Sequence, residues 1–177
     1  MTQAHYTRTA VALHWGIAAL IGAGLLMGWT MTSMAISPQR VRIYNYHKWV
    51  GVTVLGLGLL RLAWRLTHRA PQLAPMARWQ SLAARGVHAL LYVLALVVPL
   101  AGWIYSNAAG YRVVYLGRLP LPNLVDRNRE LAATWLQVHS WLATILAILA
   151  GLHVLAALQH QFIARDGTLR RIWAWRR

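Results

Sequence analysis

The sequence has no cysteine and almost no acidic residues, and each of these gaps excludes classes of protein. Without cysteine there can be no disulfide, thiolate metal site or iron–sulfur cluster, and no covalent attachment of a c-type haem. Only three acids occur, Asp126, Glu130 and Asp166, and none of them lies within a long apolar stretch. An ion-coupled transporter, which relies on carboxylates inside the membrane, is therefore disfavoured.

Charged residues of any kind are scarce, at 12%, whereas 58% of the residues are hydrophobic. A soluble domain carries about twice that charged fraction, so the chain is predicted to lie in a lipid bilayer. The net charge of +15 does not indicate a nucleic-acid partner, because the arginines occupy short stretches between apolar runs. In those positions they can meet anionic lipid head groups.

Four stretches are long and apolar enough to cross a bilayer, which takes about 20 residues of helix. They cover approximately residues 11–36, 47–64, 87–105 and 131–162. The uncharged run after Arg8 is too long for the core of a signal peptide, so the first stretch is predicted to be a spanning helix. The expected fold is an all-α integral membrane protein, a single four-transmembrane-helix bundle over residues 1–177.

The basic residues predict which side of the membrane each loop faces. An even number of spans puts both termini on one side, which carries eleven of the 18 Lys and Arg residues: Arg8, Arg61, Arg65, Arg69, Arg78, Arg85 and five C-terminal arginines from Arg165 onward. The other side carries the remaining seven. By the positive-inside rule the richer side is predicted to be cytoplasmic, with both termini inside.

Histidines inside the predicted spans are the candidate functional residues, because ionisable groups are costly in a bilayer. His139 and His153 are fourteen residues apart, which places them on almost one face of a helix and about 21 Å apart along its axis. That separation is too long for one zinc or copper ion, whose bonds to nitrogen are about 2 Å. It suits two flat cofactors bound at two depths.

A haem iron held by two histidines needs one imidazole on each side of the ring, supplied by facing helices. Because successive spans run in opposite directions, His14 and His153 lie toward the inner half of the membrane, and His47 and His139 lie toward the outer half. We therefore predict two non-covalent haems b in the bundle interior, each held by one of these pairs. His88, at a depth similar to that of His14, is an alternative inner ligand.

Other residues near these histidines suggest further roles. Gly51 and Gly151 lie close to the predicted ligands in the sequence and would leave room for a porphyrin, although glycine equally permits close helix packing. His160 follows His153 by seven residues. Both His160 and His88 could bond haem propionates or handle protons at a quinone site.

Several motifs together resemble the bacterial cytochrome b561 family, the small four-helix dihaem b cytochromes that include a membrane superoxide oxidase. The motifs are YTRTAVALHW at residues 6–15, YHKWVG at 46–51, RLAWR at 61–65, GWIYSNAAGY at 102–111 and GLH at 151–153. His139 is a further matching residue. The matches extend over almost the whole chain.

The resemblance implies haem ligation by the same four histidines and a location in the bacterial inner membrane. It also implies a quinone site near the inner haem, with His88 and His160 at matching positions and Arg78 as a further contributor. The function that it implies is electron transfer across the bilayer, from superoxide on the periplasmic side to ubiquinone.

The superoxide anion would be drawn to a basic outer surface, since a rim of one charge sign raises association rates. The residues concerned are Arg40, Arg42, Lys48, Arg112, Arg118, Arg127 and Arg129, which could equally bind lipid head groups. Two other functions stay open. One is a haem b electron-relay subunit for a partner dehydrogenase or hydrogenase, which would not be an enzyme by itself, and the other is a haem-free membrane protein.

Overall fold

The computed structural model describes residues 6–68, 77–169 and 172. Within that range the helices are α1 (Arg8–Ser33), α2 (Pro38–Thr67), α3 (Arg78–Ala108) and α4 (Arg129–Gln159), and a π-helical turn, η1 (His160–Ala164), follows α4. All four long helices have the length and apolar composition needed to cross a membrane. The predicted all-α, four-helix membrane fold is confirmed.

Polar side chains cap the starts of three helices. The side chains of Thr7, Ser37 and Asn128 precede α1, α2 and α4, and each accepts a hydrogen bond from a backbone N–H of the first turn. Such caps satisfy donors that have no partner within the helix. α1 ends at Ser33, so the predicted first span, 11–36, runs past the end of its helix.

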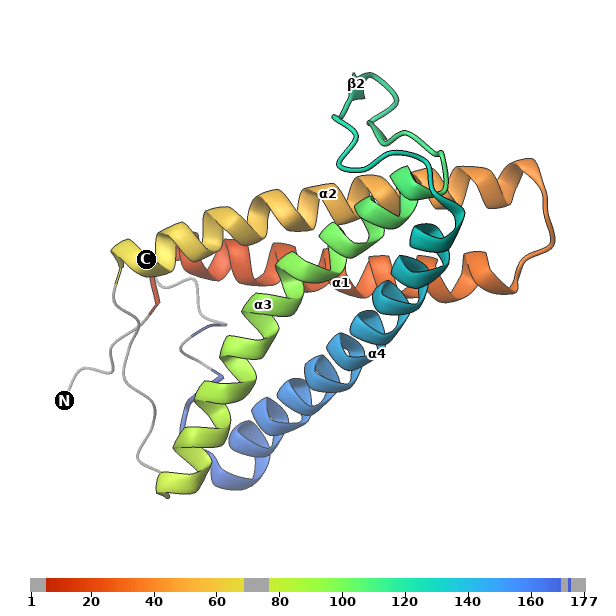
Figure 1. Cartoon of the computed structure of the whole chain (residues 1–177). Coiled ribbons are helices and arrows are strands. Elements are labelled where there is room, and N and C mark those ends of the chain that lie inside the picture. Colours follow the sequence, from red (N-terminus) through yellow and green to blue (C-terminus); the bar gives the residue numbers. More distant parts are fainter. Residues whose placement is uncertain (1–5, 69–76, 170–171, 173–177) are drawn as a thin grey trace.

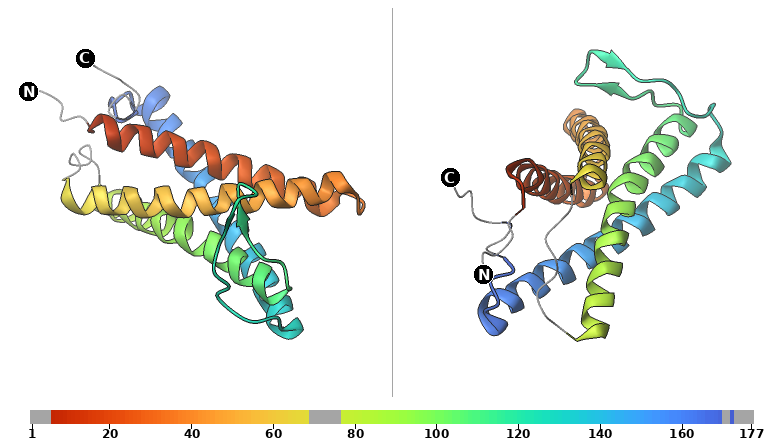
Figure 2. Two further views of the ribbon diagram at one scale, coloured as in Figure 1. Left: turned by 90° about the horizontal axis from the view of Figure 1, so that it is seen from above. Right: turned by 90° about the vertical axis from the view of Figure 1, so that its left-hand side faces the viewer.

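The helices form two antiparallel pairs that cross each other (Figure 1). In the right-hand view of Figure 2, α1 and α2 point toward the viewer while α3 and α4 run across the view. The closest packing is between α1 and α2, between α3 and α4, and between α2 and α3. Within the described residues α4 has no comparably close contact with α1 or α2, so a loosely packed seam separates α4 from the α1–α2 pair.

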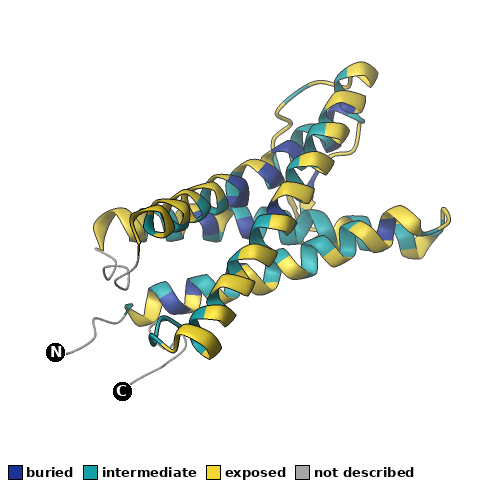
Figure 3. Ribbon diagram, turned by 90° about the horizontal axis from the view of Figure 1, so that it is seen from below, coloured by how far each residue is buried: buried dark blue, intermediate teal, exposed yellow. Residues whose placement is uncertain are grey.

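Few side chains are buried, and these lie on the inward faces of the helices (Figure 3). Leu94, Val98 and Leu146 form the core cluster, contributed by α3 and α4. Large apolar side chains such as Trp141 and Leu155 are instead exposed on the outside of the bundle. Lipid tails solvate such a surface, whereas water does not, so this outer surface is the lipid-facing surface of the protein.

The segment between α3 and α4 carries a small antiparallel hairpin, β1 (Val114–Tyr115) and β2 (Leu119–Pro120). Leu116 and Gly117 form its turn with φ of 52° and 69°, the left-handed conformation that tight hairpins favour. The hairpin projects above α2 in Figure 1. The indole N–H of Trp49 donates a hydrogen bond of 2.7 Å to the carbonyl of Val114, which holds the hairpin against α2.

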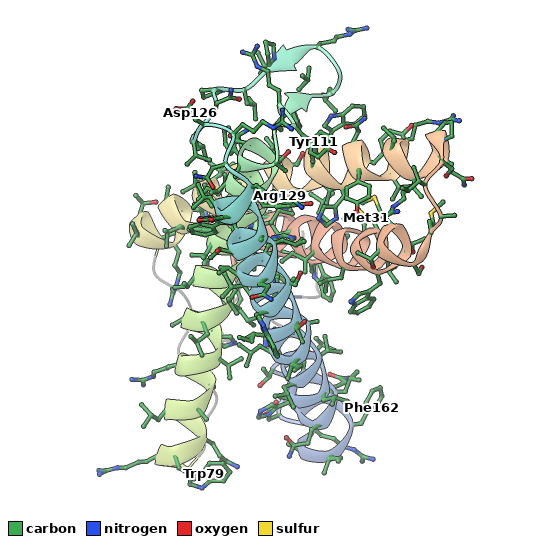
Figure 4. The ribbon with its side chains drawn as sticks, turned by 45° about the vertical axis from the view of Figure 1, so that its right-hand side comes forward. Met31, Trp79, Tyr111, Asp126, Arg129 and Phe162 are labelled. Carbon is green, nitrogen blue, oxygen red and sulfur yellow. The ribbon has the colours of Figure 1, made fainter. Side chains whose placement is uncertain are left out.

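The ends of the helices separate the molecule into two sides. Figure 4 shows Trp79, near the start of α3, and Phe162, in η1, at the same end of the molecule, far from Asp126 in the loop before α4. Among the charges counted above, Arg69, Arg170, Arg171, Arg176 and Arg177 lie outside the described residues. The orientation of the two sides in the membrane stays a prediction.

Candidate functional site

The rings of His47 on α2 and His139 on α4 face each other at the outer level. Their centres are 6.0 Å apart and their planes cross at 90°. Two imidazoles on opposite sides of one iron have centres about 6 Å apart, the sum of two bonds of about 2 Å and half of each ring. The spacing of this pair therefore fits a single iron between the rings.

Backbone carbonyls of the other two helices orient both outer rings. His47 Nδ1 lies 3.0 Å from the carbonyl oxygen of Gly24 on α1, and His139 Nδ1 lies 3.0 Å from that of Val98 on α3. A carbonyl can only accept, so Nδ1 carries the proton and donates, and Nε2 keeps the lone pair that a metal requires. All four helices thus contribute to the outer site.

A cavity of about 670 Å³ opens beside these rings, and both of them line it. This volume lies within the range of about 300–1,000 Å³ that is typical of small-molecule and cofactor sites. The glycines at which an added Cβ would face a ring are Gly28 and Gly102, at 3.6 Å from His47 Cε1 and 3.0 Å from His139 Cε1. Gly51, which its place in the sequence suggested, faces Pro99 instead.

Three histidines meet at the inner level, His14 on α1, His88 on α3 and His153 on α4. The ring centres of His14 and His153 are 6.3 Å apart, with planes at 79°. Those of His88 and His153 are 5.3 Å apart, which is closer than two imidazoles that share an iron. His14 therefore fits opposite His153 better than His88 does, and no added Cβ on the neighbouring Gly151 would meet an atom within 4 Å.

The inner rings are held differently from the outer ones. His14 Nδ1 is buried and has no hydrogen-bond partner among the described residues. The charge of Arg61, on α2, acts on all three inner rings, and its guanidinium carbon lies 5.1 Å from the centre of the Tyr92 ring. Arg61 was counted from the sequence only as an inner-side charge, because the chain alone does not show that it faces the histidines.

Beyond the inner rings, His160 pairs with Asp166. His160 Nδ1 lies 2.6 Å from Asp166 Oδ2, and Asp166 Oδ1 accepts a 2.9 Å hydrogen bond from the backbone N–H of Thr168. Burial raises the pKa of Asp166, but the hydrogen bonds from Thr168 and His160 outweigh it, so that the pKa lies below its ordinary value.

The three residues predicted near a quinone lie at different depths. His88 is beside His153, while His160, the first residue of η1, lies about 10 Å further along the helix axis. Arg78 begins α3, about 15 Å along the axis from His88. The structure therefore brings His88 to the inner site and leaves His160 and Arg78 nearer the inner end of the bundle.

The seven predicted outer cations divide into two groups. Arg40 and Lys48 line the cavity that contains the outer rings. The other five side chains are exposed: Arg42, Arg112, Arg118, Arg127 and Arg129. Figure 4 shows Arg129 at the start of α4, close to the loop that carries Asp126.

The chemistry of these sites is that of paired imidazoles. In the part of the chain that the structure describes, no three histidine or acidic side chains are arranged to hold a bare metal ion. A haem needs only two axial ligands from the protein, and each of the two levels provides a pair at the required spacing. The residues present therefore fit a haem at each level.

Comparison with known proteins identifies the family. Residues 5–175 match the family model described as prokaryotic cytochrome b561. The chain belongs to the prokaryotic cytochrome b561 family. As a member of this family, the chain is a membrane electron-transfer protein, and membership of a b-type cytochrome family implies haem b.

Relatives match this cytochrome b561 over nearly its full length. Cytochrome b561 homolog 1 of Escherichia coli (strain K12) is 31% identical over 173 residues, covering 94% of this chain and 96% of the relative. Cytochrome b561 homolog 2 of the same organism is 28% identical over 177 residues, covering 97% and 92%. A probable superoxide oxidase, CybB of Yersinia pestis, is 25% identical over 175 residues and covers 94% of both chains. The family is shared, whereas the natural donor and acceptor do not follow from these similarities.

Proposed function

We propose that the chain binds two haems b and carries electrons across the bilayer through them. His14 and His153 would hold the inner haem, and His47 and His139 would hold the outer haem. The main support is that each pair bridges the same seam, with one ring on α4 and the other on α1 or α2. The ring centres are 6.3 Å apart in the inner pair and 6.0 Å apart in the outer pair.

The loose packing of α4 against α1 and α2 supports this proposal. Helices in a membrane associate through close packing. The seam between α4 and the α1–α2 pair therefore requires something to fill it. A porphyrin gripped between paired imidazoles fills such a gap in a helical bundle. The close packing of α3 on α4 and of α1 on α2 then holds the two halves of the site at a fixed spacing.

The core between the two levels suits the passage of electrons. Leu146 lies seven residues after His139 and seven before His153, and it packs with Leu94 and Val98. This cluster carries no polar side chain, so it opposes the movement of protons or ions between the levels. When bound, haem supplies one-electron chemistry, while the helices orient its ligands and exclude water.

We infer that superoxide on the periplasmic side is the electron donor and ubiquinone is the acceptor. Two superoxide ions each lose one electron and leave as O₂, while ubiquinone takes up two electrons and two protons to become ubiquinol. The exposed outer arginines support the first half of this reaction, because a positively charged surface attracts an anion. The name of the Yersinia relative points the same way.

Groups at the inner level support the second half. His88 lies 5.3 Å from His153 between ring centres, and His160 is bonded to a carboxylate, so two imidazoles are placed to deliver protons to a quinone. Arg78 would contribute from the start of α3. This assignment places the inner level and both termini on the cytoplasmic side of the bacterial inner membrane, in accord with the positive-inside rule.

Haem content is the first test. Purified protein should contain two haems b per chain by the pyridine haemochrome assay, with a reduced-minus-oxidised spectrum of low-spin haem. Protein that folds with haem supplied and shows no Soret band would instead be the haem-free membrane protein left open by the sequence.

Stopped-flow mixing with superoxide tests the donor. Rapid reduction of the outer haem, slowed by salt because charge attraction is screened, is the expected result. If dithionite reduces the haems but superoxide does not, the proposal that superoxide is the donor is wrong. That result would favour the electron-relay subunit, whose basic outer surface would then bind a dehydrogenase or hydrogenase.

A further inference from the structure

One wall of the outer cavity is positively charged, and its cations have no role in orienting the paired histidines. Arg40, Tyr44 and Lys48 occur at intervals of four residues on α2, which places them along one face of the helix. All three line the cavity that also contains His47 and His139. The hydroxyl-bearing side chains of Tyr105 and Tyr111 line the same cavity.

Among the residues that the structure describes, Arg40 and Lys48 have no anionic partner. The three acids of the sequence all lie in the described residues, and none of them is paired with Arg40 or Lys48. Asp166 pairs instead with His160, at the opposite end of the molecule. Arg40 Nε is buried and has no hydrogen-bond partner among the described residues. Its guanidinium contacts Tyr44, with a 3.5 Å hydrogen bond to the hydroxyl and 5.6 Å from Cζ to the ring centre.

Lys48 is placed in a similar way. Its Nζ lies 5.5 Å from the centre of the Tyr111 ring, and its side chain is half-buried. A cation that is partly withdrawn from solvent on the wall of a cavity is unfavourable unless an anion compensates it. Two unpaired cations on the wall of one cavity therefore indicate a ligand with negative charge at that end.

We propose that Arg40 and Lys48, assisted by the Tyr44 hydroxyl, bind the two propionate carboxylates of the outer haem. The proposal rests on the proposed function, because it requires a haem between His47 and His139. Arg40 and Lys48 would then hold the charged edge of that haem at the wall of the cavity that they line on α2. Arg40 and Lys48 consequently serve the cofactor, and attraction of a diffusing anion falls to the five exposed arginines.

The test compares haemin with its dimethyl ester, which has the same ring and iron but no carboxylates. Titrations of haem-free protein are followed by Soret absorbance in the His153→Ala background, where the outer pair is the one remaining pair. This background is expected to bind haemin at least 10-fold more tightly than the ester, because a hydrogen bond to a charged group contributes about 1.5–3 kcal/mol.

Adding Arg40→Gln and Lys48→Gln together should remove most of that preference, by lowering the affinity for haemin and leaving that for the ester almost unchanged. Arg42→Gln is the matched control, since it removes an exposed cation from the same helix, and it should keep the preference. Equal affinity of the background protein for both ligands would overturn the proposal, and so would a full preference in the double variant.

Two further measurements keep the test decisive. If the double variant does not fold, spectroelectrochemistry of the single variants in the otherwise unchanged dihaem protein replaces the titration. Loss of a positive charge beside the propionates should then lower the reduction potential of the outer haem alone. Unchanged potentials would overturn the proposal that Arg40 and Lys48 bind the propionates. If His139→Ala added to the background still binds haemin, the ligand assignment fails, which is a separate result from loss of the preference.

Discussion

The outer and inner histidine pairs have nearly the same ring spacing but reach it by different means. Each outer ring donates a hydrogen bond to a backbone carbonyl, His47 to Gly24 and His139 to Val98. At the inner level His14 Nδ1 is buried and has no hydrogen-bond partner within the described part of the chain. His88 lies beside the pair, and the charge of Arg61 acts on it. The outer site is ordered by the backbone, whereas the inner site is surrounded by titratable and charged side chains.

This difference accords with the roles proposed for the two levels. Backbone hydrogen bonds fix the tautomer and orientation of a ligand and do not change with pH. Such rigidity suits a haem that exchanges only electrons with its donor. Groups that can gain and lose protons are useful where a quinone is reduced, and His88 and His160 are on that side.

Removal of a ligand should have the largest effect on this comparison. His139→Ala is expected to lower the haem content from two to one per chain and to spare the inner haem, and His153→Ala is expected to do the reverse. The pyridine haemochrome assay and low-temperature difference spectra measure both. His68→Ala, at an exposed position outside the pairs, is the control and should keep two haems. Retention of both haems by either ligand variant would show that the pairing is wrong.

A methyl group at Gly102 should damage the outer site selectively. The added Cβ would lie 3.0 Å from Cε1 and 3.1 Å from Nδ1 of His139, so the ring must move away from the carbonyl that orients it. Overpacking of this kind costs about 1–3 kcal/mol, which corresponds to a loss of outer-haem affinity of roughly 5- to 160-fold.

Gly28→Ala is the matched control for that prediction, because its Cβ would meet His47 Cε1 at 3.6 Å, an ordinary contact distance. Haem titration should show a much smaller loss than for Gly102→Ala. Equal losses would mean that the site adapts to added volume and that the close approach at Gly102 has no special importance.

His88→Ala should leave two haems in place and alter only the inner one. The His88 ring is too close to His153 to share an iron with it, but it borders the inner site, so the spectrum or potential of the inner haem should shift. His14→Ala should instead lose that haem. If His88→Ala loses the haem and His14→Ala keeps it, His88 is the inner ligand.

The smallest expected effect concerns Asp166. Because its pKa is lowered in the folded protein, the ionised carboxylate stabilises the fold above about pH 4, and this contribution disappears as the pH falls through the folded pKa. Asp166→Asn should therefore lower the melting temperature at pH 7 by at most about 2–4 °C, as expected for an ion pair near the surface. Thermal unfolding followed by circular dichroism should show the two proteins converging at low pH, and a difference that grew there would contradict the assigned sign.

Much of this site could be predicted before the fold was known. The long apolar stretches defined the four helices, and helical periodicity placed His139 and His153 on one face at two depths. Depth alone then paired them with His47 and His14, and the rings of both pairs do face each other in the structure. Depth did not separate His14 from His88, because both enter the membrane at a similar level.

Other features depended on contacts between helices. The glycines next to the outer rings are Gly28 and Gly102 rather than Gly51, because which glycine faces a ring depends on helix rotation. Helix rotation also places Arg40 and Lys48 on the wall of the cavity. The sequence alone did not distinguish them from the five exposed arginines.

By itself the sequence determined that this chain lies in a membrane, crosses it four times and carries histidines at two levels, because hydropathy and helical rise are local properties. Only the tertiary structure decided which imidazoles approach within reach of one iron, which carbonyls orient them and which cations line the cavity. Those relations depend on how helices from distant parts of the chain cross and rotate against one another.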